Sequence, residues 1–355
     1  MDEAERTASS MYLENLLENL VIKGDNFKAL SYLLFNGYKN KIDLVYIDPP
    51  FSTNSDFRMT NERTRTISNS KHGIIAYSDK LAGEEYIEFI RRRIVLIYEL
   101  LSEKGSFYMH IDSKIGHYIK IVLDEIFGGD NFINDIARRK SNPKNFARKA
   151  YGNQRDVVLF YAKNRGKHIW NDIRINFCED ELAERYKKKD PFGRRYTTVP
   201  IHAPGETNDG ATGGVWKGML PPEGRHWRCS PEDLDKLEKK GLIEWSKSGN
   251  PRWIKYADEN KGKKIQDIWL DYLDPVYPDY PTQKNLKMLE MIVKQSSNPE
   301  SIVLDAFAGS GNTLIAARNN GRKYIAIDKS EKSIEIIENK IKKDKKNERV
   351  SYFQL

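Results

Sequence analysis

The chain has 355 residues, with 59 Lys and Arg against 51 Asp and Glu, which gives a formal net charge of +8 at pH 7. That length suits one large α/β domain with an insertion of roughly 100 residues. No apolar run approaches the ~18 residues of a membrane span, and Cys178 and Cys229 form neither a zinc pattern nor a disulfide framework. The acidic first residues precede no signal-type apolar segment, so we expect a cytoplasmic protein with no membrane contact and no metal.

The first strand-end carboxylate in chain order is Asp25. A short helix over residues 12–20 and a strand over 20–23 are expected to lead to Gly24-Asp25. Asp25 also stands where it can cap a helix expected over 27–34. The residue type alone leaves both roles, capping and ligand binding, open.

The second strand-end carboxylate is Asp48, in the motif Asp48-Pro49-Pro50-Phe51. It follows an apolar run over 42–47, and because proline cannot donate to a sheet ladder the run predicts a buried strand that stops here. Asp48 and the Pro49 carbonyl can accept hydrogen bonds from the exocyclic amine of a planar base, while Phe51 stacks on its ring. Taken alone, the motif is more typical of an ordinary Asp-Pro turn.

The following segment, 52–83, is polar and has little periodic apolar content. We expect a mobile loop beside the active site, with plain disorder as the alternative. Helical periodicity then predicts an amphipathic helix over 84–101, and a strand over 105–112 and a helix over 113–127 come next. His110 lies on that strand and is more typical of a satisfied core residue than of a general base.

Basic charge is concentrated between residues 138 and 195, where 17 Lys and Arg stand against 7 Asp and Glu. Strands are expected over 133–139 and 156–161, joined by a basic, Asn-rich loop. Such a patch can neutralise DNA phosphates, although solvated lysines on ordinary helix faces explain it equally well. The candidate phosphate contacts are Arg138, Arg139, Lys140, Lys144, Arg148, Lys149, Arg155, Lys187, Lys188 and Lys189.

Residues 165–264 differ in composition from the rest of the chain, because all six Trp lie in or just beyond them among clusters of Pro and Gly. Two short runs, 242–245 and 252–256, flank a turn and predict a hairpin. We expect a separate small domain whose Trp residues mostly form its core. Arg228 and Arg252 are interleaved with aromatic residues, and such side chains can also read base edges or stack on displaced bases.

A Gly-rich turn follows the strand expected over 301–305, and a helix over 312–320 and a strand over 323–327 complete a βαβ unit. Asp328 stands nineteen positions after Gly309, the spacing at which such a unit presents a carboxylate to a ribose. The third Gly of the dinucleotide fingerprint is missing, which favours a nucleoside cofactor without a pyrophosphate. A tight turn that needs Gly for its backbone angles is the alternative. The Lys-rich helix that closes the chain is interpreted as a solvated face.

Asp48-Pro49-Pro50-Phe51 resembles the catalytic motif, and the turn from Asp305 to Gly311 the cofactor loop, of the DNA amino-methyltransferases that use S-adenosylmethionine. The catalytic motif precedes the cofactor loop, as in their circularly permuted β class. The stretches over 76–86 and 105–112 resemble the modification subunits of type III restriction systems and their stand-alone relatives.

This resemblance implies an α/β fold, a doubly wound Rossmann-like methyltransferase sheet that is circularly permuted and carries an inserted target-recognition domain. The catalytic half would span 1–164, the target-recognition domain 165–264 and the cofactor-binding half 265–355. In such a sheet the strands ending at Asp48 and Asp305 are expected to be neighbours, because ligands bind where the strand order reverses.

The resemblance assigns catalysis to Asp48, Pro49, Pro50 and Phe51. Family members carry a Pro-Thr-x-Lys ahead of the cofactor strand, which matches Thr282 and Lys284, although Asn285 stands where relatives have Pro and leaves the local turn open. The implied cofactor contacts are Asp25, Thr282, Lys284, Asp305, Phe307, Gly309, Gly311, Asn312, Thr313 and Asp328.

The implied reaction is methylation of the N6 amine of a flipped adenine in double-stranded DNA, in the modification arm of a restriction system or a solitary relative. The resemblance also allows two protein partners, a second copy of this chain in a homodimer and a restriction subunit. A cytosine-N4 enzyme is one alternative, and such enzymes usually have Ser where Asp48 stands. A catalytically idle DNA-binding subunit is another, and the intact Asp48, Phe51, Gly309 and Gly311 argue against it.

Overall fold

The structure is a computed structural model that describes residues 19–50, 55–59, 74–79, 83–143, 149–207, 210–281, 283–343 and 349–355. The chain divides into two compact units, unit 1 (Met1–Ile173 with Gln266–Leu355) and unit 2 (Arg174–Ile265). Unit 2 therefore begins at Arg174 rather than at the expected 165. The residues just before Arg174 are hydrogen-bonded to unit 1, since the amide of Ile169 donates to the carbonyl of Lys104. In the described ranges, no helix is both long and apolar enough to cross a membrane.

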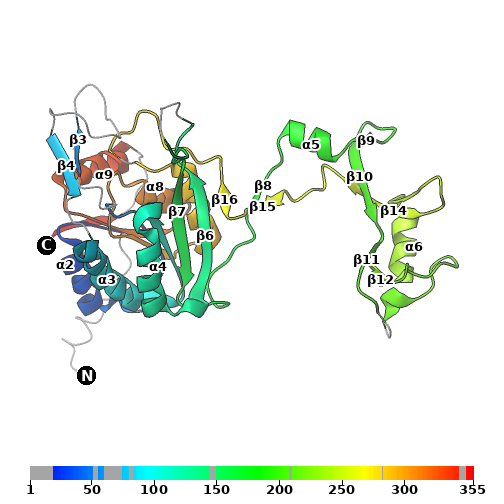
Figure 1. Cartoon of the computed structure of the whole chain (residues 1–355), viewed down its shortest axis with the longest axis horizontal. Helices are drawn as coiled ribbons and strands as arrows, with labels where there is room; N and C mark the ends of the chain where they lie inside the picture. Colours follow the sequence, from blue (N-terminus) through cyan, green and yellow to red (C-terminus); the bar gives the residue numbers. More distant parts are fainter. Residues whose placement is uncertain are drawn as a thin grey trace. The chain divides into compact units, whose positions relative to one another are not determined.

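Nine strands form the sheet of unit 1 in the order β16-β6-β7-β5-β2-β17-β18-β1-β19 (Figure 1). They are β1 (Asn19–Lys23), β2 (Ile42–Ile47), β5 (Leu101–Ile111), β6 (Phe132–Arg139), β7 (Arg155–Ala162), β16 (Ile268–Trp269), β17 (Ile302–Asp305), β18 (Lys323–Asp328) and β19 (Val350–Gln354). β7 is antiparallel to β5 and to β6, whereas the other neighbouring pairs are parallel. The expected doubly wound, permuted sheet is confirmed.

Helices cover both faces of this sheet. They are α2 (Asn26–Leu33), α3 (Gly83–Leu100), α4 (Ser113–Phe127), α7 (Leu286–Ser296), α8 (Asn312–Asn319) and α9 (Glu331–Lys343), with the short turns η1 (Leu34–Tyr38) and η2 (Gly129–Asn131). Successive residues of a strand point to opposite faces. On β5, Phe107 accordingly stacks on Phe127 of α4, while the hydroxyl of Tyr108 lies 2.7 Å from that of Ser296 on α7. All six residues of β2 are buried, as in a central strand covered on both faces.

Three local expectations need correction. The polar segment 52–83 is not loop throughout, because it contains β3 (Ser55–Met59) and β4 (Ile74–Asp79), which pair antiparallel. β5 begins at Leu101, directly after α3, rather than at 105. β19 was not expected at all. It pairs parallel with β1, whose sequence lies about 330 residues away, so local sequence carries no sign of the pairing. The helix expected over 12–20 lies outside the described residues.

Unit 2 is built around a four-stranded sheet, β13-β14-β10-β9, and two smaller pairs, β11-β12 and β8-β15. Its elements are β8 (Arg174–Ile175), α5 (Glu179–Arg185), β9 (Lys188–Lys189), β10 (Arg195–Pro200), β11 (His202–Pro204), η3 (Ala211–Gly213), β12 (Arg225–Trp227), α6 (Pro231–Lys239), β13 (Ile243–Trp245), β14 (Pro251–Tyr256) and β15 (Lys263–Lys264). The expected hairpin is confirmed as the antiparallel pair β13-β14. Trp216 and Trp227 pack with Ile201 and Leu234 in a small core. The chain enters and leaves this unit through the antiparallel ladder β8-β15.

Candidate active site

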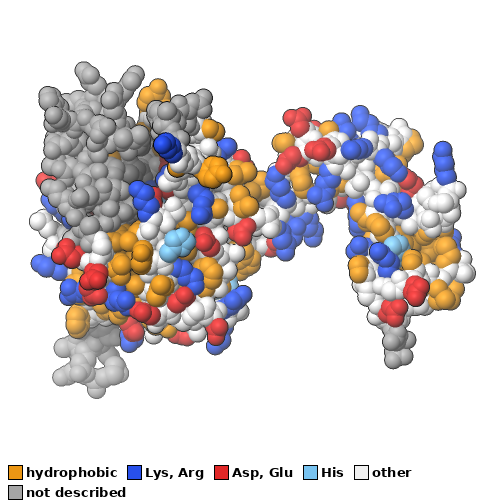
Figure 2. Space-filling view, viewed as in Figure 1, with side chains coloured by type: hydrophobic (Ala, Val, Ile, Leu, Met, Phe, Trp, Pro, Cys, Tyr) orange, Lys and Arg blue, Asp and Glu red, His pale blue; other side chains and the backbone are white. Residues whose placement is uncertain are grey.

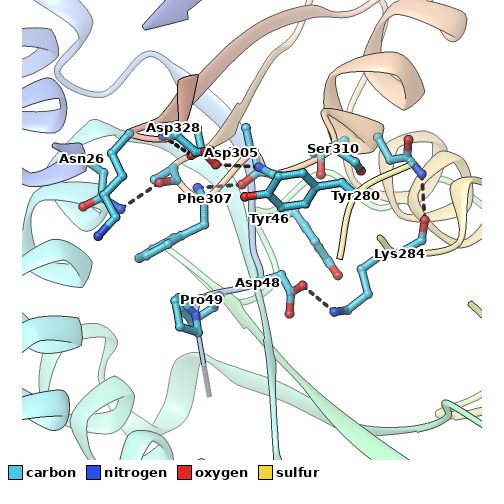
Figure 3. A pocket seen from close by; sticks show the side chains of 18 of the residues that line it. Asn26, Tyr46, Asp48, Pro49, Tyr280, Lys284, Asp305, Phe307, Ser310 and Asp328 are labelled. Atoms are coloured by element: carbon cyan, nitrogen blue, oxygen red, sulfur yellow. Dashed lines mark hydrogen bonds and ion pairs between the residues drawn. The ribbon is translucent and has the colours of Figure 1, made fainter. Parts of the chain in front are cut away.

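The two strands that carry the sequence motifs lie side by side. β2 and β17 pair in parallel, with Val45 opposite Leu304, so Asp48 and Asp305 emerge at the same edge of the sheet. The sheet continues from β2 to β5 on one side and from β17 to β18 on the other, which is the reversal of strand order where doubly wound sheets bind ligands. A pocket opens at this edge (Figure 3). It is lined by the ends of β2, β17 and β18, the β1–α2 turn, α3 and the segment that precedes α7.

Asp48 lines the pocket with one carboxylate oxygen held and the other unpaired. Its Oδ2 forms an ion pair with Nζ of Lys284 (Figure 3). Its Oδ1 is buried and has no hydrogen-bond partner among the residues that the structure describes. Buried acceptors are normally bonded, because leaving one unpaired costs about 1–3 kcal/mol. A ligand with a hydrogen-bond donor would satisfy this atom. Pro49 and Pro50 line the same pocket, whereas Phe51 lies outside the described residues.

Lys284 was expected to border the cofactor, and it does line the pocket. Its ammonium, however, lies on Asp48, so it links the segment before α7 to the catalytic motif. The same segment contributes Tyr280, and Thr282 lies outside the described part of the chain. Asn285, the departure from the family pattern, caps α7 by accepting from the amide of Met288 at 3.2 Å. The local turn that the missing proline left open is therefore a regular helix N-terminus.

The Gly-rich turn is closed by Asp328. Its Oδ2 accepts from the amide of Gly309 and its Oδ1 from the amide of Ser330, both at 2.8 Å. Gly309 has φ +49° and lines the pocket. Gly311 has φ +73°, and a Cβ there would lie 2.6 Å from Cγ1 of Ile337 on α9. The turn thus needs Gly311 for its backbone angle and for helix packing, and the expected cofactor contact is not what fixes this position.

Four carboxylates line the pocket, those of Asp25, Asp48, Asp305 and Asp328. Burial raises the pKa of Asp305 to about 7, hydrogen bonds from Thr313 and the amide of Phe307 oppose the shift, and the charges of Asp48 and Asp328 add to it. Burial also raises the pKa of Asp328, against hydrogen bonds from the amides of Ser330 and Gly309. Four carboxylates against two lysines, Lys284 and Lys329, favour a ligand that carries positive charge.

An apolar wall stands on another side of the pocket. The rings of Phe307 and Phe89 meet edge to face with their centroids 6.3 Å apart, and both residues line the cavity. The guanidinium of Arg93 lies 3.5 Å from the centroid of Phe89 and bonds to the side chain of Asn26. Sequence reasoning assigned α3 to structure alone, and it missed Phe89 and Arg93. A charged residue within the buried stripe of α3 was the available signal.

Asp25 fills the capping role, and its ligand-binding role stays a prediction. Its Oδ1 caps α2 by accepting from the amides of Phe27 and Lys28, at 3.0 and 3.2 Å. Its Oδ2 lies 3.2 Å from Nη2 of Arg93. Asp25 and its neighbour Asn26 both line the pocket, and Asn26 donates to the carbonyl of Ala306 at 2.9 Å, which ties the β1–α2 turn to the cofactor loop.

Helix α9 is hydrogen-bonded to the cofactor loop through Lys340. Nζ of Lys340 donates to the carbonyl of Ser310 at 2.9 Å and to Oδ1 of Asn312 at 2.8 Å, and burial lowers the pKa of this lysine. The interpretation of this Lys-rich helix as a solvated face is therefore wrong for Lys340. Asn312 in turn donates through Nδ2 to the carbonyl of Lys284 at 2.8 Å. Its neighbour Thr313 lines the pocket and bonds to Asp305.

The basic run at the end of β6 does not lie on the surface as a unit. Arg138 is wholly buried, where it donates to the carbonyl of Tyr272 and pairs with Asp274, so its expected phosphate contact is wrong. Strand alternation explains this, because neighbours on a strand face opposite sides. Lys140 pairs with Asp156 at 2.7 Å and retains partial exposure. Arg139 is partly buried, Lys149 is exposed, and Lys144 and Arg148 lie outside the described ranges.

His110 is a satisfied core residue, as expected. Its Nδ1 lies 3.0 Å from the hydroxyl of Tyr46 and its Nε2 3.1 Å from Oδ2 of Asp156. Burial lowers the pKa of His110, with the charge of Lys284 as the next contribution. The imidazole is therefore neutral behind the pocket, and Tyr46 is the member of this buried set that reaches the pocket lining.

In unit 2 the two candidate base-reading arginines differ. Arg252 donates to the hydroxyl and carbonyl oxygens of Thr198, at 2.9 and 2.8 Å, so its guanidinium ties β14 to β10. Arg228 is exposed and donates through Nε to the carbonyl of Pro200. Arg225 lies nearby, 3.3 Å from Nδ1 of His202. Lys and Arg side chains are spread over the visible face of this unit (Figure 2).

Comparison with known proteins agrees with this geometry. A family model described as DNA methylase, for N6 and N4 enzymes, matches residues 42–339. The type II methyltransferase M.EcaI of Enterobacter cloacae is 42% identical over 320 residues, which cover 89% of this chain and 67% of that protein. The type III restriction-modification enzyme EcoP15I Mod subunit of Escherichia coli is 25% identical over 86% of this chain, and the chain spans 56% of its length. The solved structure of the M1.HpyAVI–SAM complex aligns with 17% identity over 90% of this chain and 99% of that one, at a TM-score of 0.47. The chain belongs to the family of N6 and N4 DNA methylases.

Proposed function

We propose that this DNA methyltransferase transfers a methyl group to the N6 amine of an adenine rotated out of double-stranded DNA, as the modification enzyme of a restriction-modification system. The observation that carries the proposal is the buried Oδ1 of Asp48 at the pocket edge, which has no hydrogen-bond partner among the described residues. The N–H group of an amine would donate a hydrogen bond to this carboxylate oxygen. The Pro49 carbonyl follows Asp48 in the chain and supplies a second acceptor at the same strand end.

The pocket residues fit S-adenosylmethionine as the methyl donor. S-adenosylmethionine supplies an electrophilic methyl group on a positively charged sulfonium. Asp305 and Asp328 place negative groups in the pocket that favour such a cation, and the wall of Phe307 and Phe89 offers aromatic surface to an adenine ring. Asp25 and Asn26, at the β1–α2 turn, would border the adenosine part.

Asp48 and the Pro49 carbonyl would act by orientation. The lone pair of an adenine N6 is delocalised into the ring, and hydrogen bonds from N6 to these two acceptors draw the nitrogen toward a tetrahedral geometry. The same bonds aim the lone pair into the pocket. Well-oriented reactants can gain roughly 7–11 kcal/mol, so positioning rather than a strong base carries most of the acceleration. Rotating the base out of the duplex costs a few kcal/mol.

Adenine is proposed over cytosine because position 48 is Asp, where cytosine-N4 enzymes usually have Ser. The family covers both bases. A cytosine-N4 activity is thus the second candidate. Mapping modified bases in DNA from cells that express the protein separates the two, since the position of the methyl group is read directly.

Unit 2 is proposed as the target-recognition domain, with double-stranded DNA as its partner. Its exposed arginines support a role in grooves or along the backbone. The Mod subunits among the relatives suggest a restriction subunit as a further partner, and a homodimer remains part of the proposal.

The test of the catalytic assignment is Asp48→Ala. Methyl transfer from labelled S-adenosylmethionine to unmethylated DNA should disappear, while calorimetry shows that cofactor binding survives, because Asp48 contacts the amine. Asp130→Ala, at an exposed turn, is the matched control and should behave as wild type. Transfer by Asp48→Ala within about tenfold of wild type would refute the role of Asp48.

A further inference from the structure

The ion pair between Lys284 and Asp48 is largely withdrawn from solvent. The Lys284 side chain is 7% exposed and that of Asp48 14%. A buried pair is costly to form, since both charges leave water, and it persists where its geometry is well supported. Support here comes from the Lys284 backbone, whose carbonyl accepts from Asn312 at 2.8 Å, and from Asn285, whose amide donates to Asp274 at 3.1 Å.

We infer that Lys284 is a positioning residue for methyl transfer: its ammonium holds Oδ2 of Asp48 so that Oδ1 faces the target amine. The inference rests on the proposed function of Asp48 as the acceptor of the amine. It gives Lys284 a role distinct from the cofactor contact that its position in the family motif implies.

The surroundings of Asp48 explain why a cation is needed. Asp305 on β17 is close enough for its charge and that of Asp48 to disfavour each other. Tyr46 on β2 and His110 on β5 also feel the charge of Asp48, but burial raises the pKa of Tyr46 and lowers that of His110, so both are neutral. Without the Lys284 ammonium, Oδ2 of Asp48 loses its ion-pair partner, and repulsion from Asp305 can turn the carboxylate so that Oδ1 no longer faces the amine.

The same lysine connects the two halves of the site. Lys340 holds Asn312, Asn312 holds the carbonyl of Lys284, and the Lys284 ammonium holds Asp48. Asn312, directly after the cofactor loop, and the Asp48 carboxylate are thus both bonded to Lys284. A displacement of reacting groups by about 1 Å can slow a reaction roughly a hundredfold, so this connection matters for rate more than for affinity.

The experiment compares Lys284→Met, which removes the charge, with Lys284→Arg, which keeps it. Lys287→Met, at an exposed position of α7, is the control. Single-turnover methyl incorporation from labelled S-adenosylmethionine into unmethylated bacterial DNA is measured at saturating cofactor, and cofactor affinity is taken from calorimetry. Lys284→Met should lose roughly a hundredfold in rate, because Oδ2 of Asp48 is no longer held in place. Cofactor affinity should change by less than about threefold.

Lys284→Arg should recover most of the rate that Lys284→Met loses, because its guanidinium can still pair with Oδ2 of Asp48, and a role in packing alone would not produce this rescue. Should Lys284→Met fail to fold, Lys284→Gln replaces it in the same comparison. A Lys284→Met enzyme with the rate of wild type overturns the inference, and so does a loss confined to cofactor affinity. Equal losses of rate in the Met and the Arg variants also overturn it. These results are separate from failure of the proposed function, which an active Asp48→Ala would reveal.

Discussion

Replacing Gly311 with Ala should destabilise unit 1 through two additive effects. The residue has φ +73°, a left-handed conformation that costs a side chain about 1–2 kcal/mol. Its new Cβ would also lie 2.6 Å from Cγ1 of the fully buried Ile337, and overpacking of this kind costs typically 1–3 kcal/mol. We therefore expect the free energy of unfolding to fall by about 2–5 kcal/mol, equivalent to a drop in Tm of roughly 4–10 °C for a unit of this size.

Gly321→Ala separates the two effects. Gly321 has φ +69°, but a Cβ there meets nothing within 4 Å, so only the backbone strain applies. Urea unfolding followed by circular dichroism should show a smaller loss for Gly321→Ala than for Gly311→Ala. The double variant Gly311→Ala/Ile337→Ala should lose less stability than the two single variants lose together, since the shortened side chain at position 337 no longer clashes with the new Cβ at position 311. Equal losses at positions 311 and 321 would refute the assignment of Gly311 to helix packing.

Asp305 has a folded-state pKa of about 7, raised by burial above its ordinary value, so it stabilises the fold at low pH and that contribution is lost as pH rises from about 4 to about 7. The free energy of unfolding should fall by up to about 1.4 kcal/mol per pH unit in this window, and Asp305→Asn should flatten the slope; an unchanged slope would contradict the shift. Phe89→Ala should weaken S-adenosylmethionine binding by about 1–3 kcal/mol in calorimetry, whereas Phe35→Ala at an exposed site should not, and equal affinities would remove Phe89 from the cofactor site. Arg228→Ala should lower the salt dependence of DNA binding by about one counterion, while Arg194→Ala, whose guanidinium pairs with two carboxylates, should leave it unchanged; identical slopes would argue against a DNA contact at Arg228.

The parts of the fold that follow from local chemistry could be predicted from the sequence. An apolar run that stops at proline gave the buried strand ending at Asp48, and helical periodicity gave α4 with its observed bounds. The pairing of β2 with β17 also followed, because strand order in a doubly wound sheet is restricted to few arrangements.

The remaining features depend on contacts between residues far apart in the chain. Arg138 and Arg139 are equally basic in sequence, and only the strand register and Asp274, 136 positions away, decide that Arg138 is buried. Lys340 belongs to a Lys-rich helix whose other lysines suit a solvated face. It differs because its ammonium donates a hydrogen bond to the carbonyl of Ser310 in the cofactor loop. Lys284 was found by motif, but its ion pair with Asp48 spans 236 positions and required the folded chain.

The ladder β8-β15 joins the two ends of unit 2, so unit 2 is inserted in the chain as one replaceable segment. Arg174 lies opposite Lys264 and Ile175 opposite Lys263, so the chain departs and returns at one place. An insertion whose ends already adjoin leaves the host with almost no loop to close, and longer or different inserts add only slowly to that entropic cost. Recombination at these two points could replace the whole of unit 2 without touching a strand of the nine-stranded sheet. Under the proposed role of unit 2 in target recognition, such an exchange would change the target sequence in a single genetic event and leave the pocket of unit 1 intact.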